Sequence, residues 1–104
     1  MTELRVTRPI KRAPSHPGEL MREILDDHVR LTVAGAARRM DVSRQSLHAV
    51  LSGASAVTAD MALRFGKLVG GAPELYVSMQ MAHDLWQARQ KLRDTLERIE
   101  PVAS

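Results

Sequence analysis

Residues that begin and end helices recur along the middle of the chain at intervals that leave room only for short helices. Three hydroxyl-bearing residues precede runs with a helical spacing of apolar side chains: Thr32, Ser43 and Thr58. Such a side chain can accept a hydrogen bond from a free backbone N–H group of the first helical turn. Gly53 and Gly70 follow these runs, in the place where a left-handed residue ends a helix. The spacing therefore predicts a bundle of short helices over residues 16–72.

Proline residues predict two further helices at the edges of this region. Pro17 suits the first turn of a helix because its missing N–H would have no partner there. One face of that helix carries Leu20, Ile24 and Leu25. Pro73 suits the first turn of a last helix that continues to Ile99. If unbroken, its roughly 27 residues would reach about 40 Å. Four of its apolar residues form one stripe: Leu75, Met79, Ala82 and Trp86.

The composition agrees with helices. Only three residues are aromatic, so the core must be built from Leu, Val, Ala, Met and Ile, which favours helices over a sandwich of strands. We expect an all-α fold of five helices. Its parts would be an arm over 1–15, a domain of short helices over 16–72 and a long C-terminal helix over 73–104.

Several classes of protein are excluded or disfavoured. Cysteine is absent, which excludes disulfides, thiolate metal sites and cysteine nucleophiles. The chain starts without an apolar leader, and no run approaches the roughly 18 apolar residues of a membrane span. The four histidines lack metal-binding spacing, and Asp26-Asp27-His28 is better explained as a solvated helix end than as an acid–base cluster. We expect a cytoplasmic protein that is not an enzyme and has no catalytic residues, metal, cofactor or membrane segment.

The net charge of +3 comes entirely from the start of the chain. The first fifteen residues hold one acid, Glu3, and four bases: Arg5, Arg8, Lys11 and Arg12. Residues 16–75 and 76–104 each hold equal numbers of bases and acids. Prolines interrupt the basic segment, so we predict an extended or mobile arm. Such an arm suits DNA phosphates, a minor groove or an acidic protein surface.

Residues 32–53 carry the pattern of a helix-turn-helix. The first short helix has two adjacent small residues, Ala36 and Ala37, where a partner helix can approach closely. The turn contains one apolar residue, Val42, which can fill the corner. The inner face of the second helix consists of Leu47, Val50 and Leu51. Its outer face consists of Arg44, Gln45, His48 and Ser52. In this motif the second helix enters the major groove of DNA.

The residue types on the outer face suit base reading. Arg44 can donate to O6 and N7 of guanine, and Gln45 can pair with N6 and N7 of adenine. His48 can reach a base or a phosphate one turn further along, and Ser43 with the free N–H groups of the helix start can hold a phosphate. The same residues also suit an ordinary solvated helix face, and an interaction module without DNA binding remains an alternative.

The segment from Ser43 to Leu47, followed by Leu51-Ser52-Gly53, resembles the recognition helix of the Xre/Cro (phage-repressor-like) helix-turn-helix family. More specifically, His16-Pro17-Gly18-Glu19 and the segment 62–80 are similar to HigA-type antitoxins. The resemblance covers roughly residues 16–86. Two positions depart from the pattern: Val33 stands where the repressor group often has Gln, and Tyr76 where many HigA-type sequences have Trp.

The resemblance implies a homodimeric antitoxin of a type II toxin–antitoxin module. It would bind a HigB-type mRNA-cleaving toxin and repress its own operon at a palindromic operator of double-stranded DNA. The base-reading positions would be Ser43, Arg44, Gln45 and His48. The positions near phosphates would be Thr32, Ser52, Gly53 and Ser55. The alternative is a stand-alone regulator of the same fold without a toxin.

The late part of the last helix predicts a contact between two copies. Its apolar residues there are Leu92, Leu96 and Ile99. They lie beyond the reach of a small core, so we expect them to form a dimer seam. The alternative is that this segment folds back on its own domain.

Overall fold

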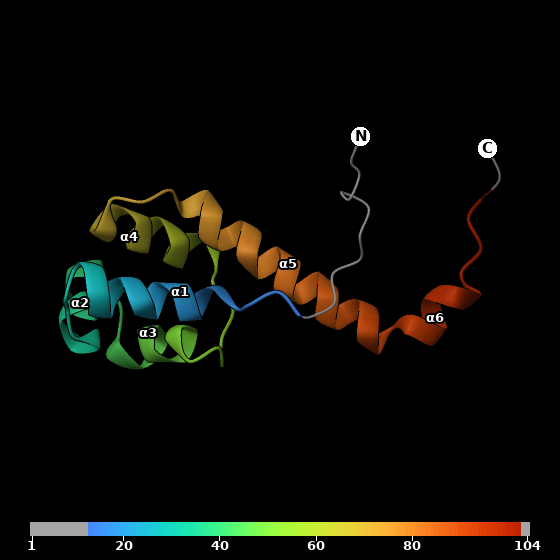
Figure 1. The fold of residues 1–104 in the computed structure, drawn as a ribbon, viewed down its shortest axis with the longest axis horizontal. Coiled ribbons are helices and arrows are strands. Elements are labelled where there is room, and N and C mark those ends of the chain that lie inside the picture. The colour runs from blue at the N-terminus through green and yellow to red at the C-terminus, as the bar shows by residue number, and fades with distance from the viewer. Residues whose placement is uncertain (1–12, 103–104) are drawn as a thin grey trace, which may run out of the picture.

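The computed structural model describes residues 13–102, which form helices and connecting segments without a strand in this range. The helices are α1 (Pro17–Glu23), η2 (Ile24–His28), α2 (Val33–Met40), α3 (Arg44–Leu51), α4 (Ala59–Val69), α5 (Pro73–Lys91) and α6 (Arg93–Arg98). Helices α1 to α4 gather at one end, and α5 runs away from them toward α6 (Figure 1). The predicted all-α fold is confirmed, with η2 continuing α1 and α6 continuing α5.

The core lies where helices α1 to α4 and the first part of α5 meet. Helix α1 packs against α3 and α5, α2 packs against α3 and α4, and α4 packs against α5. One large side chain from each of four segments is fully enclosed: Met21, Leu25, Leu47 and Phe65. Ala36 and Ala37 are also buried, so the expected close approach at α2 is confirmed. The small core thus depends on aliphatic side chains and two buried aromatic rings, Phe65 and Tyr76.

Gly18 sets the distance between α1 and α3. A Cβ atom at this position would lie 2.2 Å from the carbonyl oxygen of Val50 and 2.9 Å from that of Leu51. Both are backbone atoms at the end of α3, so neither can move aside without moving the helix. His16 caps α1 directly before this contact, because its Nδ1 accepts a hydrogen bond of 2.9 Å from the Gly18 N–H. The first turn of α1 therefore lies against the last turn of α3.

The first helical segment ends in a wider turn. Residues 24–28 form a π-helix, and the Val29 N–H donates to the Ile24 carbonyl over 3.0 Å. Arg30 then has a positive φ of 55°, which only a few per cent of non-glycine residues adopt. This left-handed residue reverses the chain so that α2 begins within a few residues of η2.

Helix α5 faces the core along a different stripe from the expected one. Tyr76 and Gln80 are its buried residues, whereas Leu75 is 48% exposed. The Tyr76 ring stands edge-on against Phe65, with centroids 5.2 Å apart, and this contact turns Leu75 outward. Burial raises the pKa of the Tyr76 phenol, because the charged form would lose its hydration. Of the stripe expected from the sequence, Met79 and Trp86 are half-buried, whereas Leu75 and Ala82 are exposed.

Gln80 connects α5 to the loop between α3 and α4. Its Oε1 accepts a hydrogen bond of 2.7 Å from the Val57 N–H, and its Nε2 donates to Asp84 over 2.9 Å. Both ends of this buried amide are thereby satisfied, which is what a polar side chain in a core requires. The base of α5 is fixed to the domain by hydrogen bonds as well as by apolar contacts.

Beyond the core, the C-terminal helix is broken. Leu92 ends α5 and precedes α6, and none of the residues of α6 is buried. The expected single helix over 73–99 is therefore interrupted at Leu92, where φ is −100° and ψ is 12°. The molecule measures 53 × 35 × 25 Å along its principal axes.

Replacing Gly18 with alanine tests the close approach of α1 and α3. We expect Gly18→Ala to lower the free energy of unfolding by about 3 kcal/mol, the upper end for overpacking, because the added methyl group meets backbone atoms. Chemical denaturation measures this change. Glu19→Ala, at the next and exposed position, is the control and should cost far less. Equal losses for the two variants would contradict the packing argument.

Candidate nucleic-acid interface

The turn between α2 and α3 has the geometry that a helix-turn-helix needs. Asp41 ends α2 in the left-handed conformation, with a φ of 59°, and the Val42 N–H donates back to the Ala37 carbonyl. The side chain of Val42 is half-buried, as expected for a residue that fills the corner. Ser43 then caps α3, because its hydroxyl oxygen accepts the Ser46 N–H over 3.0 Å. The caps expected at Thr32 and Thr58 are present as well.

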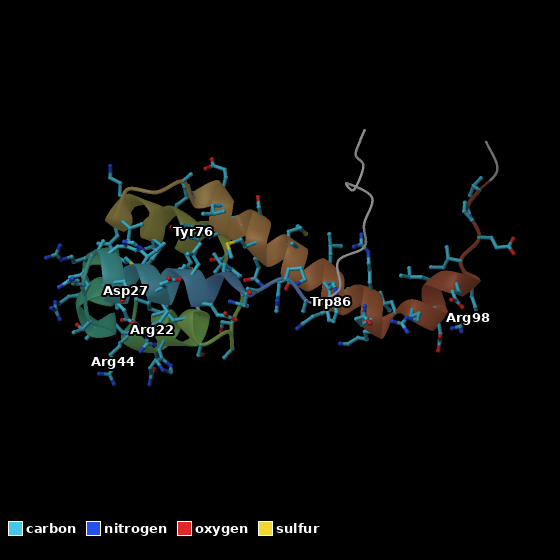
Figure 2. The ribbon with its side chains drawn as sticks, viewed as in Figure 1. Arg22, Asp27, Arg44, Tyr76, Trp86 and Arg98 are labelled. Atoms are coloured by element: carbon cyan, nitrogen blue, oxygen red, sulfur yellow. The ribbon has the colours of Figure 1, made fainter. Side chains whose placement is uncertain are left out.

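Helix α3 divides into the two faces expected from its sequence. Leu47, Val50 and Leu51 are buried. The side chains on the outer face are exposed: Arg44, Gln45, Ser46, His48 and Ser52. Figure 2 shows Arg44 pointing away from the domain, at the end of the molecule opposite Arg98. No other part of the described chain therefore covers the outer face of α3, the face that would meet DNA.

A shallow hollow joins the start of α2 to the start of α3. Its walls are Thr32, Val33, Ala34, Arg44, Gln45 and His48. It thus brings together three of the expected base-reading residues and Thr32, one of the expected phosphate contacts. The Thr32 oxygen accepts the Gly35 N–H, which leaves its own O–H group to donate outward. Polar side chains from both helices can reach one ligand here.

Ser43 has the capping role expected from the sequence, and its hydroxyl also pairs with that of Ser46. The Ser43 hydroxyl donates to the Ser46 hydroxyl over 2.8 Å while it accepts the Ser46 N–H. Its hydrogen-bonding capacity thus serves mainly to begin the helix. Ser46 is exposed beside Arg44 and Gln45, and its hydroxyl hydrogen can turn outward. Sequence reasoning did not single out Ser46, although helical periodicity places it on the outer face.

The loop after α3 is held tightly by bonds to that helix. The N–H groups of Ser52, Gly53 and Ser55 donate to the carbonyls of His48, Val50 and Ala49, in that order. Gly53 has a φ of 85°, the left-handed conformation expected at the end of a helix. The only donor of Gly53 is engaged, and the Ser52 hydroxyl donates to the Ala49 carbonyl over 3.2 Å, so the side-chain donor that this loop can offer to a phosphate is the hydroxyl of Ser55.

Arg64 on α4 holds the turn of the helix-turn-helix from behind. Its Nη1 donates to the carbonyls of Met40 (2.7 Å) and Asp41 (3.0 Å), which would otherwise be free at the end of α2. Its Nε donates to Asp60 one turn earlier on the same helix, and this hydrogen bond and charge raise the pKa of Arg64. The spacing of Asp60 and Arg64 predicts their pairing, but only the packing of α4 against α2 reveals the bonds to Met40 and Asp41.

The remaining expected contacts lie elsewhere. Leu92, Leu96 and Ile99 are on the outer part of the C-terminal helix, with exposed fractions of 42%, 45% and 61%. The basic residues of the arm, Arg5, Arg8, Lys11 and Arg12, lie outside the described residues.

Two kinds of feature are absent from the described residues. None of their helices is both long and apolar enough to cross a membrane. Across residues 13–102, no three His, Asp or Glu side chains gather as they would around a metal ion.

Substituting Arg64 tests whether it holds the turn. We expect Arg64→Lys to keep the charge but to weaken the bonds to the two carbonyls, since one ammonium group cannot replace both the Nε that binds Asp60 and the Nη1 that binds the carbonyls. Hydrogen exchange of the Val42 amide should become about fivefold faster, the equivalent of one net hydrogen bond. Lys67→Arg, on the exposed face of α4, serves as the control. Unchanged Val42 exchange in Arg64→Lys would contradict this role.

Comparison with known proteins finds similar sequences and similar folds, although no family model matches the chain. Antitoxin HigA-1 of Vibrio cholerae is 26% identical over 95 residues, which cover 91% of this chain and 90% of that protein. A HigA-family addiction module antidote protein from Coxiella burnetii has a TM-score of 0.79 and 32% identity, covering 88% of this chain and 100% of its own. Antitoxin GraA in complex with its operator has a TM-score of 0.78 and 29% identity, covering 92% and 100%.

Proposed function

The chain belongs to the HigA family of helix-turn-helix antidote proteins, and on this premise we propose that it is a cytoplasmic antitoxin that also represses its own operon. It binds a palindromic operator as a homodimer and neutralises a HigB-type mRNA-cleaving toxin by direct protein binding. The hollow between the starts of α2 and α3 carries the DNA-binding part of the proposal, because it collects Thr32, Arg44, Gln45 and His48 around one space.

Each side chain of this hollow has a task in the proposal. Arg44 and Gln45, in the first turn of α3, read base edges in the major groove, and Ser46 lies beside them. His48 contacts a base or phosphate one turn later. Thr32 donates its hydroxyl hydrogen to a phosphate at the start of α2. Ser43 keeps α3 capped, so that these side chains stay in place.

The charge balance favours a dimer over a single domain. Residues 16–75 have no net charge, so a general attraction to DNA contributes little to their binding. Affinity must therefore come from a few placed contacts, and two copies double their number on a palindrome with half-sites about 34–36 Å apart. We place the contact between the copies on Leu92, Leu96 and Ile99, whose side chains are exposed on the projecting segment. Sedimentation on and off DNA tests this, and a monomer in both would contradict it.

The toxin-binding part is tested by isolating the chain from its native operon. We expect a small basic ribonuclease to co-purify with it, and the purified complex to lack the mRNA-cleaving activity of the free toxin. A stand-alone regulator would instead protect its upstream region in footprinting but retain no partner. That outcome would contradict the antitoxin function and would leave the repressor function standing.

The DNA-binding part is tested by Arg44→Ala. We expect a loss of about 1–3 kcal/mol in operator binding, which is roughly 5- to 150-fold in Kd, with relaxed preference at one base pair. The arginine is exposed, so the fold should not change. Lys67→Ala removes one positive charge from the exposed face of α4 and should leave Kd nearly unchanged. An unaltered footprint and affinity for Arg44→Ala would show that another face binds DNA.

A further inference from the structure

Three segments that are distant in sequence meet at the imidazole of His16. The side chain is 8% exposed and lies at the start of α1. Its Nδ1 lies 2.9 Å from the Gly18 nitrogen, and its Nε2 lies 3.0 Å from the carbonyl oxygen of Ser55 in the loop after α3. On its other side the ring of His83 from α5 stands edge-on, with centroids 5.3 Å apart. Each ring nitrogen therefore has one defined partner.

The two hydrogen bonds determine which nitrogen of His16 carries the proton. The Gly18 partner is a backbone N–H, which can only donate, so Nδ1 must be an unprotonated acceptor. The Ser55 partner is a carbonyl, which can only accept, so Nε2 must carry the hydrogen and donate it. Both bonds form together only when the ring is neutral and protonated on Nε2. A ring protonated on both nitrogens would place two donors against each other at Gly18.

The bond to Ser55 reaches the loop that directly follows the recognition helix. Ser55 is also tied to the end of that helix through its own N–H, which donates to the Ala49 carbonyl over 3.0 Å. The residue thus has its N–H held by α3 and its carbonyl held by His16. A Cβ atom at Gly53 would lie 3.8 Å from Cγ of His16, so the ring also lies beside the left-handed turn of this loop. The path of the Ser52–Ser55 loop depends on the His16 ring.

We infer that His16 is a positioning residue for DNA binding. Through its Nε2–H it holds the Ser52–Ser55 loop in the conformation that directs the Ser55 hydroxyl toward an operator phosphate. This inference rests on the proposed repressor function. His16 then has two roles: its Nδ1 caps α1, and its Nε2 holds the loop. His83 supports the ring from α5 and donates its own Nδ1 hydrogen to the Pro14 carbonyl over 2.9 Å.

Two substitutions separate the two bonds of His16. The amide of asparagine matches the reach of Nδ1, so His16→Asn keeps an acceptor for the Gly18 N–H and loses the bond to Ser55. The amide of glutamine matches the reach of Nε2, so His16→Gln keeps a donor for Ser55 and weakens the cap. If His16 only stabilised the fold, operator affinity would follow the thermal stability of the two variants.

We expect operator affinity to follow the loop bond instead. His16→Asn should bind the native upstream DNA about five- to tenfold more weakly, with an unchanged dependence of Kd on salt because the lost phosphate contact is a neutral hydroxyl. His16→Gln should restore most of the affinity even where its melting temperature is the lower of the two. His83→Phe keeps the edge-on ring contact and removes the bond to Pro14. It should bind like the wild type.

Nitrogen NMR of the wild-type imidazole gives a readout that does not require DNA. We expect His16 to show a protonated Nε2 and an unprotonated Nδ1, and His16→Asn to shift the Ser55 and Ala56 resonances more than His16→Gln does. The inference is overturned by a proton on Nδ1, or by equal operator affinity of the Asn and Gln variants at wild-type strength. If the wild type itself binds no upstream DNA, the proposed function fails, while the NMR result still decides the loop bond.

Discussion

The crossing of α1 over the end of α3 depends on the missing side chain at Gly18. Only a hydrogen atom fits between the helix backbone and the carbonyls of Val50 and Leu51. Because the first turn of α1 lies so close, the residue before it, His16, can reach the loop that leaves α3. The inner side chains of α3 are enclosed by the same contact. The outer face of α3 is thereby turned to solvent in one defined orientation.

The recognition helix is held at both of its ends. At the start, Ser43 caps the helix, and Arg64 from α4 fixes the preceding turn through two carbonyls. At the end, Gly18 and His16 fix the last turn and the loop. A domain with no net charge over residues 16–75 relies on a few well-placed contacts, and those contacts are effective only when the helix that carries them is rigidly supported. The rigid support of α3 and the absence of net charge over residues 16–75 therefore both favour binding through a few specific contacts.

Helix α5 serves two purposes along its length. Its first part is built into the domain through the Tyr76 ring and the Gln80 amide. Its later part projects beyond the core and carries exposed leucines into α6 (Figure 1). The helix therefore joins the packed domain to a surface that has no partner within the described chain.

The sequence by itself determined the elements that local physics controls. Thr32, Ser43 and Thr58 begin helices because a hydroxyl can accept the first free N–H groups, and the two faces of α3 follow from helical periodicity alone. The resemblance at residues 16–19 and 43–53 also led to the right family. Only the tertiary structure decided that Tyr76 rather than Leu75 faces the core, that Arg64 holds the turn, and that His16 reaches Ser55. Each of these depends on how two distant segments approach each other, and no pattern within a single helix specifies that distance or angle.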